Sequence, residues 1–462
     1  MSDDTATSSR REKFLCVIEK EKNPPQGRPE GTVIAEIGDE IYFEPEILDT
    51  FDVEGCQPLH YDLLLLAAAV EFADRRWKRP RGWSRTLNLT LPVFELGTWQ
   101  KSEVIEHLQR ALRHLTGDAW RFDFVQAIDV SPLGLRQGVL HFPKKKTFAI
   151  AYSEGLDSRA VSALSGKKDE ALCIRVANQP QRRRNGDSPF DQIPFRVKGH
   201  GSSESSFRSR GFQFAAVTAI AAQLSNIPRI VVPESGQGAL GPVLRPLHNV
   251  YADYRNHPTF FRKMERFTRA LLGHDVRYEQ PRLWHTKAQT MSAFLAIRGK
   301  SKEELINTRS CWQTRRVVNV DGVRKHCGLC AACLLRRLSI HAAELEETAA
   351  TYVVSDLSTG DLSEAFAAIP LKEDRLIMME YGSIGARHLQ HLADMATWPD
   401  DQLTQHVSEI AAATDATPEE TLANLRTLLV NHAREWHEFV AVQGPHTFLQ
   451  SWIEGGRHGR SE

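Results

Sequence analysis

The hydrophobic and polar positions in the first third of the chain predict a mixture of strands and helices. Strands are predicted at residues 32–37, 40–43 and 86–93, and helices at residues 61–76 and 101–115. In the last of these strands, Leu87, Leu89 and Leu91 alternate with polar side chains, a period of two that is typical of a half-buried strand. Together these elements predict a small α+β domain at residues 31–145.

From residue 146 onward, apolar runs of strand length alternate with runs of helical spacing. Strands are predicted at residues 147–152, 171–176, 195–199 and 229–232, and helices at residues 158–164, 211–224, 258–272, 290–298 and 302–308. Such alternation is typical of a parallel sheet with crossover helices, in which ligands bind at the carboxyl ends of the strands. We therefore expect residues 146–340 to form an α/β domain.

The two ends of the chain depart from this alternation. Residues 1–30 are polar and contain Pro24, Pro25 and Pro29, so most of this stretch is predicted to be a mobile tail. Residues 341–462 are almost entirely helical in pattern and carry no chemical motif. We expect a helical domain there, used for packing or for contact with a partner.

Composition narrows the class of protein. Hydrophobic residues make up 41% and charged residues 25% of the 462 residues, as is usual for a soluble globular protein. The 58 basic residues balance the 58 acidic ones, so net charge gives no argument for nucleic acid or an anionic membrane as a partner. The sequence has no apolar segment of about 18 residues that could cross a bilayer, and residues 1–11 lack the apolar stretch of a signal peptide. We expect a cytoplasmic protein.

A short polar run follows the apolar residues 148–151 and reads Ser153-Glu154-Gly155-Leu156-Asp157-Ser158. A phosphate-binding loop needs close backbone approach, hydroxyl donors and a helix N-terminus. Gly155 can provide the close approach, Ser153 and Ser158 the hydroxyls, and a helix opening near Asp157 the dipole. An ordinary turn with an Asp or Ser N-cap explains the same residues equally well.

Four cysteines fall in one short region. Cys311 precedes Cys327-Gly-Leu-Cys330-Ala-Ala-Cys333, which contains two overlapping C-x-x-C units. Four thiolates are the tetrahedral ligand set of structural zinc. An iron–sulfur cluster and buried free thiols are the alternatives.

Three further places carry side chains that suit an anion or a polar ligand. Arg208 and Arg210 flank a predicted helix start, where paired guanidinium groups suit a phosphate or a carboxylate, although solvated arginines are equally common. Glu234 and Gln237 follow the strand at residues 229–232. Lys287 on its own is typical of a surface lysine.

The run at residues 153–158 is similar to the Ser-Gly-Gly-x-Asp-Ser signature of the N-type ATP pyrophosphatases, the PP-loop enzymes. In that family a substrate attacks the α-phosphate of ATP and pyrophosphate leaves. Glu154 stands where the family has a second glycine. A carboxylate there repels a desolvated triphosphate unless it points away or binds the metal ion.

The order of the motifs resembles that of the 7-cyano-7-deazaguanine synthases (QueC-like proteins). The similar pieces are Phe207-Arg-Ser-Arg-Gly-x-x-Phe214, His285-Thr-Lys287, Cys311-Trp312, and Cys327-Gly-x-Cys330-x-x-Cys333-x-x-Arg336. The resemblance covers residues 146–340, and the chain extends beyond it on both sides. In this it is similar to the extended QueC-like proteins of bacterial antiphage defence clusters.

This resemblance implies a PP-loop fold of the adenine nucleotide alpha hydrolase type, with ATP, Mg²⁺ and Zn²⁺ as cofactors. It implies that ATP is bound by Tyr152, Ser153, Glu154, Gly155, Leu156, Asp157, Ser158 and Arg208. The implied catalytic residues are Asp157, Ser158, Arg210 and Lys287. Glu234 and Gln237 are expected to contact the deazaguanine, and Cys311, Cys327, Cys330 and Cys333 to bind zinc.

The implied reaction is the ATP-dependent activation of a 7-deazaguanine carboxylate, followed by attack of an amine. The amine is ammonia, giving an amide and then a nitrile, or belongs to a protein, giving a conjugate. Two alternatives remain open at this point. One is a tRNA-modifying PP-loop enzyme, and the other is a defence-complex scaffold whose loop Glu154 has disabled.

Overall fold

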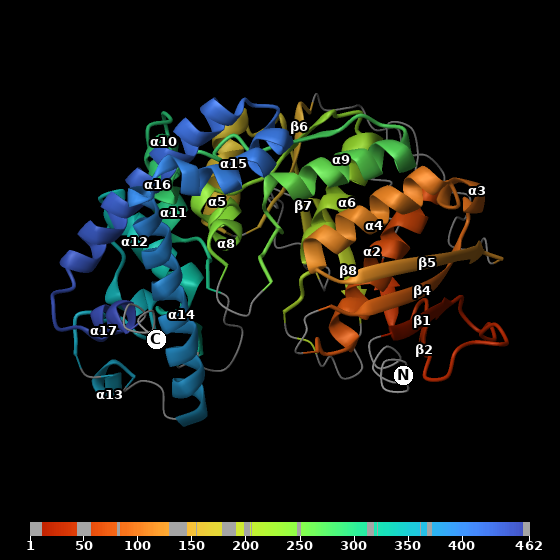
Figure 1. Cartoon of the computed structure of the whole chain (residues 1–462), viewed down its shortest axis with the longest axis horizontal. Helices are drawn as coiled ribbons and strands as arrows, with labels where there is room; N and C mark the ends of the chain where they lie inside the picture. Colours follow the sequence, from red (N-terminus) through yellow and green to blue (C-terminus); the bar gives the residue numbers. More distant parts are fainter. Residues whose placement is uncertain are drawn as a thin grey trace. The chain divides into compact units, whose positions relative to one another are not determined.

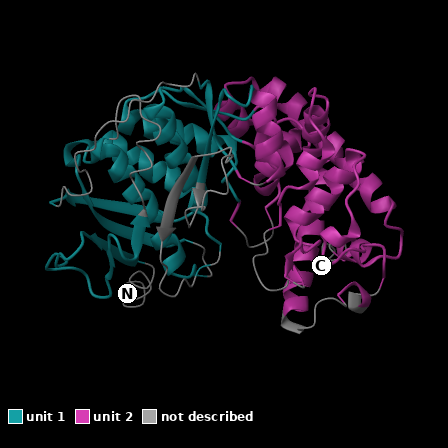
Figure 2. Cartoon of the chain, turned by 180° about the vertical axis from the view of Figure 1, so that it is seen from behind, with its two compact units in different colours: residues 1–152, 166–232, 253–280 teal, residues 153–165, 233–252, 281–462 magenta. Residues whose placement is uncertain are grey.

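The structure is a computed structural model of the whole chain (Figure 1). It describes residues 12–43, 57–80, 84–128, 146–153, 155–177, 191–197, 204, 206–246, 251–311, 318–320, 322–360, 362–366 and 372–455. The chain forms two compact units (Figure 2). The first unit comprises Met1–Tyr152, Gly166–Val232 and Asp253–Gln280, and the second comprises Ser153–Ser165, Pro233–Ala252 and Pro281–Glu462.

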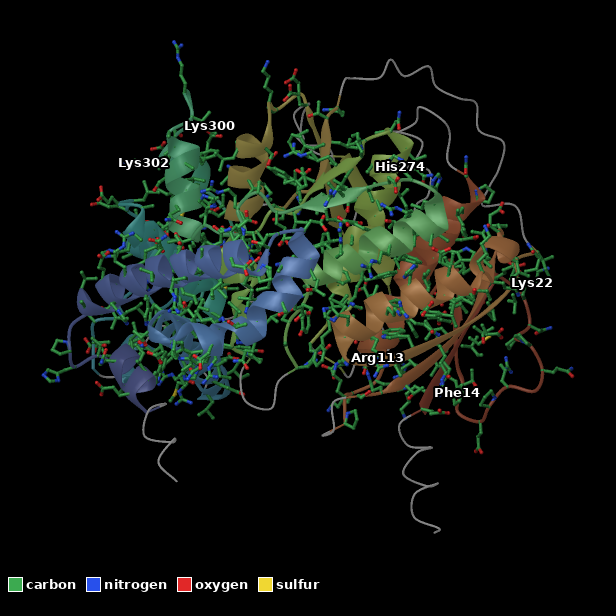
Figure 3. The ribbon with its side chains drawn as sticks, turned by 45° about the horizontal axis from the view of Figure 1, so that its top comes forward. Phe14, Lys22, Arg113, His274, Lys300 and Lys302 are labelled. Atoms are coloured by element: carbon green, nitrogen blue, oxygen red, sulfur yellow. The ribbon has the colours of Figure 1, made fainter. Side chains whose placement is uncertain are left out.

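The first unit contains a four-stranded parallel sheet of order β2-β1-β4-β5. Its strands are β1 (Glu12–Ile18), β2 (Val33–Glu36), β4 (Thr86–Val93) and β5 (Ala119–Gln126). The prediction of a mobile tail is wrong for β1, which also carries the Phe14 labelled in Figure 3. This strand pairs on both sides, with β2 and β4, and Leu15, Cys16 and Val17 are buried. Its short apolar run is stabilised by neighbouring strands that lie far along the sequence.

A six-stranded sheet of order β10-β9-β6-β7-β8-β3 completes the first unit. Its strands are β3 (Ile41–Phe43), β6 (Phe148–Ala151), β7 (Ala171–Ala177), β8 (Asp191–Val197), β9 (Arg229–Val231) and β10 (Arg277–Glu279). All neighbours are parallel except β3 and β8. The prediction of a parallel sheet is confirmed, although β8 begins four residues before the strand expected at 195–199. Since β3 joins this second sheet, the expected domain boundary at residue 146 does not separate the two sheets.

Helices line the two sheets of the first unit (Figure 1). They are α2 (Pro58–Arg76), α3 (Leu96–Trp99), α4 (Ser102–Thr116), α6 (Arg210–Leu224) and α9 (Pro258–Leu272). Helices α2 and α4 contact the four-stranded sheet, and α6 and α9 contact the six-stranded sheet. Because α2 also packs on α6 and α4 packs on α9, buried residues of both sheets belong to one hydrophobic cluster.

The second unit is helical apart from a short hairpin of β11 (Asn319–Val320) and β12 (Val323–Arg324). Its helices are α5 (Leu156–Ser165), α7 (Gly236–Ala239), α8 (Gly241–Leu244), α10 (Lys287–Leu295), α11 (Lys302–Ile306), α12 (Ala331–Ala342), α13 (Leu362–Ala365), α14 (Lys372–Asp394), α15 (Asp400–Thr414), α16 (Pro418–Ala441) and α17 (Phe448–Glu454). The helical character predicted for the C-terminal stretch is confirmed.

The expected boundary between residues 340 and 341 does not separate two bodies, because α12 packs directly on α14 and α16. A small residue makes one of these contacts possible. A Cβ placed on Gly385 of α14 would lie 2.9 Å from the Cα of Ala331 at the start of α12. The two helices therefore approach each other at backbone distance, and the C-terminal helices share a core with the cysteine-rich segment.

None of the helices in the described part of the chain combines the length and the apolar composition needed to cross a bilayer.

Candidate functional site

The loop expected to bind phosphate leads into α5 and is held by its own hydroxyl groups. The Ser158 hydroxyl donates to the Ser153 carbonyl at 2.8 Å, and the Gly155 amide donates to Ser153 Oγ at 3.1 Å. Leu156 is buried in an apolar cluster that includes Met291 and Phe294 of α10. Thus the loop is folded back on itself and its helix is anchored on α10.

Tyr152 and Glu154 are two further loop residues expected to bind ATP. Tyr152 belongs to the first unit, where its amide donates to the Ile174 carbonyl at 2.7 Å. Glu154 lies outside the described residues.

The structure brings Asp157 and Lys287 together. Lys287 is the first residue of α10, and its Nζ forms an ion pair with Asp157 Oδ2. The other carboxylate oxygen of Asp157 accepts a hydrogen bond from Ser235 Oγ at 3.0 Å. Lys287 is buried, with 9% of its side chain exposed, and is therefore no ordinary surface lysine. Two of the expected catalytic residues, Asp157 and Lys287, are therefore in direct contact.

The N-terminus of α10 is fixed by a capping box. Thr286 Oγ1 accepts from the Gln289 amide at 3.1 Å, and the Gln289 side chain accepts from the Thr286 amide at 2.9 Å. The Thr286 hydroxyl also donates to Glu435 Oε1 of α16 at 2.6 Å. Helix α16 therefore supports the helix that carries Lys287. No local signal in the sequence points to Glu435.

The side chain of Gln237 is bonded within the protein, and the substrate contact expected from the sequence stays a prediction. Its Oε1 accepts from the Lys287 amide at 2.7 Å, and its Nε2 lies 2.9 Å from His432 Nδ1 of α16. Both ends of the amide group are therefore occupied by the protein, and the residue is buried. Glu234 also turns toward its own loop, since its Oε1 accepts from the Ser235 amide at 3.3 Å.

The two arginines expected at the site belong to the first unit. Arg210 begins α6, and its guanidinium lies 5.2 Å from the centre of the Phe214 ring. Burial lowers the pKa of Arg210, and the nearby Arg255 lowers it further. Burial also lowers the pKa of Arg208, to about 10. Arg208 is half-buried, and Arg210, although surrounded by enough protein atoms to be partly desolvated, is exposed to solvent.

The four clustered cysteines meet in the second unit. The sulfur atoms of Cys311, Cys327, Cys330 and Cys333 all lie within 4.8 Å of one another, and the last three residues are buried. Sulfur ligands on bonds of about 2.3 Å around a tetrahedral ion lie roughly 3.8 Å apart, and the sulfurs of Cys327 and Cys333 are 3.7 Å apart. The cluster could therefore hold a metal ion such as zinc, as the sequence predicts.

Gly328 shapes the knuckle between the first two of the buried cysteines. It has a φ of +90°, and a Cβ at this position would lie 2.2 Å from the Val354 carbonyl oxygen. Only glycine accommodates both the left-handed backbone and this close approach. Amide groups also point at sulfur, since the Cys330 amide donates to Cys327 Sγ at 3.3 Å.

Arg336 holds the segment that precedes Cys311. This fully buried guanidinium donates to Thr308 Oγ1 at 2.8 Å, to the Ile306 carbonyl at 2.8 Å and to Glu347 Oε1 at 2.9 Å. The same segment lies against the loop, because a Cβ on Gly155 would be 3.6 Å from the Arg309 carbonyl oxygen. A continuous set of contacts thus connects the cysteine cluster to the loop.

No family model matches this sequence, and neither a curated protein nor a solved structure matches it.

Substitution of Glu435 by glutamine is expected to change the pH dependence of stability. Burial raises the pKa of Glu435 from 4.5 to about 7, against the opposing effects of Thr286 and Arg434. The folded chain therefore binds more protons than the unfolded chain between these values, so stability falls as pH rises through this window. A shift of this size costs the wild type about 3 kcal/mol above pH 7.

Urea unfolding at intervals between pH 4 and 8 checks this prediction. The free energy of unfolding of Glu435→Gln should exceed that of the wild type by up to about 3 kcal/mol at pH 8, and by little at pH 4. Glu419→Gln is the matched control, because Glu419 is exposed in the first turn of the same helix. A constant difference across the pH range would contradict the prediction.

Proposed function

We propose that this protein is a PP-loop enzyme that uses ATP to activate a carboxylate on a 7-deazaguanine for attack by an amine. The chemistry comes from the resemblance to the 7-cyano-7-deazaguanine synthases. The observation that best supports it is the ion pair between Asp157 and Lys287, which are 130 positions apart in the sequence. The resemblance assigns both residues to ATP, and they are in direct contact.

The surroundings of this pair suit a triphosphate and its metal ion. The Lys287 ammonium is a compact cation that can exchange its ion pair with Asp157 for one with a phosphate. The Asp157 carboxylate is then free, and carboxylates are ligands that Mg²⁺ prefers. The loop places Ser153 and Ser158 at the N-terminus of α5, where the helix dipole favours an anion. We propose that ATP displaces the lysine from the carboxylate and binds with Mg²⁺ at this loop.

Sheet topology agrees with this proposal. The loop at residues 153–158 follows β6, and the Ser235 loop follows β9, which is the neighbour of β6 in the sheet. Strand order reverses at this pair, since β7 and β8 extend to one side and β10 to the other. Segments that follow two such strands are the usual ligand-binding segments of open α/β sheets.

The proposed reaction has two steps. A carboxylate oxygen attacks the α-phosphorus of ATP, the bond to the β-phosphate oxygen breaks, and pyrophosphate leaves with Mg²⁺. An amine then attacks the acyl carbon, the carbon–nitrogen bond forms, AMP leaves, and the amine loses a proton. With ammonia the product is an amide, which a second ATP-dependent dehydration converts to a nitrile. With a protein amine the product is a conjugate, and we propose a role in antiviral defence.

The four cysteines would hold zinc as a structural ion. Four thiolates leave no open coordination position, so a bound ion would cross-link Cys311 to the start of α12 and would take no part in the reaction.

The test is to incubate the full-length protein with ATP, Mg²⁺, 7-carboxy-7-deazaguanine and ammonia. We expect AMP and pyrophosphate in equal amounts, dependent on the carboxylate, and an amide or nitrile by mass spectrometry. Absence of heat on titration with millimolar ATP and Mg²⁺ would instead favour the scaffold function. AMP formation that requires tRNA would favour the tRNA-modifying function.

A further inference from the structure

Arg282 belongs to the second unit, in the segment that leads into α10, and no sequence motif includes it. Its Nε donates to Thr290 Oγ1 at 3.2 Å, and its Nη2 donates to the Gln289 carbonyl at 3.3 Å. Thr290 Oγ1 lies 3.4 Å from Ser235 Oγ, which donates to Asp157 at 3.0 Å. A chain of polar contacts through Thr290 and Ser235 therefore connects the guanidinium to the carboxylate of the loop.

The charge of Arg282 is not balanced by an acid in the described part of the chain. Two buried cations of the second unit have a carboxylate partner, as Lys287 has Asp157 and Arg336 has Glu347, whereas Arg282 is half-buried. No described carboxylate pairs with Arg282, and its Nη1 makes no hydrogen bond to the described residues. Burial lowers the pKa of Arg282, and no neighbouring acid opposes this effect. A half-buried guanidinium with unused donors is suited to an anionic ligand.

We infer that Arg282 binds the carboxylate group of the second substrate and so selects a carboxylic acid at this site. This inference rests on the proposed function, because it assigns a residue to the substrate that attacks ATP. Arg282 positions the reacting group and contributes charge, and it adds no covalent step to the reaction.

The arrangement around Asp157 favours the carboxylate over a phosphate as the ligand of Arg282. Lys287 contacts Oδ2 of Asp157, whereas the path to Arg282 leaves from Oδ1 through Ser235 and Thr290. Lys287 thus contacts the loop carboxylate directly, whereas Arg282 is separated from it by the hydroxyl groups of Ser235 and Thr290. The reaction needs two anions side by side, the triphosphate and the attacking carboxylate, and these repel each other. A separate guanidinium for the carboxylate, bound through two parallel N–H donors, offsets this repulsion.

The experiment compares the wild type with Arg282→Gln and Arg282→Lys as full-length proteins. KM for 7-carboxy-7-deazaguanine and kcat are measured by AMP formation, and ATP affinity by calorimetric titration. We expect Arg282→Gln to raise KM for the carboxylate by about 10- to 100-fold, as expected for loss of a charge-assisted contact. ATP affinity should change less than about threefold. KM of Arg282→Lys for the carboxylate should lie between those of the wild type and Arg282→Gln, because lysine keeps the positive charge but lacks two parallel N–H donors.

A binding measurement separates this contact from general damage to the site. Wild-type protein should bind the 7-carboxylate more tightly than the uncharged 7-amide, and Arg282→Gln should bind both equally. Arg298→Gln is the matched control, because Arg298 is exposed beyond the other end of α10. Retained preference in Arg282→Gln, or an equal loss of ATP affinity, would overturn the inference. Failure of the wild type to form AMP would overturn the proposed function itself.

Discussion

Asp157→Ala is expected to abolish AMP and pyrophosphate formation. The substitution removes the carboxylate that pairs with Lys287 and accepts from Ser235. In the proposed reaction it also removes a ligand of Mg²⁺, which neutralises charge on the leaving pyrophosphate. Losses of about 1000-fold or more are usual when a site loses one of its main electrostatic groups.

Ser158→Ala should have a comparable effect for a different reason. The Ser158 hydroxyl donates to the Ser153 carbonyl within the loop, and the residue is buried, with 3% exposed. Its loss removes both a proposed phosphate donor and a contact that folds the loop. Ser165→Ala is the matched control, since its hydroxyl bonds to the Val161 carbonyl within the same helix.

Both variants are measured in the AMP-forming assay together with thermal unfolding. Lys302→Met serves as a second control for charge removal, because Lys302 is exposed at the start of α11 (Figure 3). Full turnover by Asp157→Ala or Ser158→Ala, with the fold intact, would disprove the assignment of the loop to ATP.

Cys330→Ser is expected to remove the bound metal and to destabilise the second unit. Cys330 is fully buried and belongs to the same hydrophobic cluster as α14 and α16. Loss of one thiolate opens the tetrahedral site and leaves three thiols, of which those of Cys327 and Cys333 are buried and that of Cys311 accepts from the Cys327 amide. Loss of a structural metal is among the few single changes that cost on the order of 5 kcal/mol.

Metal content and thermal unfolding measure this effect. We expect close to one zinc per wild-type chain, none in Cys330→Ser, and a colourless protein, whereas an iron–sulfur cluster would absorb visible light. Cys16→Ala is the control, because Cys16 is a buried cysteine of the first unit, outside the cluster. A Cys330→Ser protein that keeps its metal and its stability would show that the cluster is not a structural site.

Removal of the metal ion with a chelator tests whether the cysteine cluster also supports the loop at residues 153–158. Arg336 ties residues 306–308 to α12, and the Arg309 carbonyl lies against Gly155. Removal of the metal should therefore also weaken ATP binding, measured by calorimetric titration. Unchanged ATP affinity after chelation would mean that this segment keeps its place without the ion.

Local pattern predicted the individual elements well. The alternation of Leu87, Leu89 and Leu91 matches β4 at the predicted bounds, and α6 and α9 lie within one residue of their predictions. The predicted ends of some helices were less accurate. Helix α10 begins at Lys287, three residues before the prediction, because the Thr286 capping box starts it.

The candidate site was only partly predictable. The motif residues Asp157 and Lys287 could be named in advance, because the loop and the His-Thr-Lys run have recognisable local sequences. The contributions of Ser235, Arg282 and Glu435 could not. Arg282 and Glu435 lie in segments without a motif, and in the segment of Ser235 the sequence favoured Glu234 and Gln237. A side chain on α16 comes to lie beside Thr286 only after the whole unit has folded.

The sequence by itself determined the short-range features of this protein. Cysteine spacing predicted a four-thiol cluster, hydrophobic period predicted a parallel sheet followed by helices, and the loop residues predicted a turn into a helix. These features depend on neighbours within a few positions, whose chemistry and spacing are written directly in the chain.

Only the tertiary structure decided which of these elements belong together. It made residues 12–18 an inner strand, because pairing on both sides satisfies a backbone that the sequence alone left as a tail. It joined the C-terminal helices to the cysteine cluster, because Gly385 lets α14 reach α12. It also turned Gln237 toward Lys287 and His432. Such contacts depend on long-range packing, which no local pattern encodes.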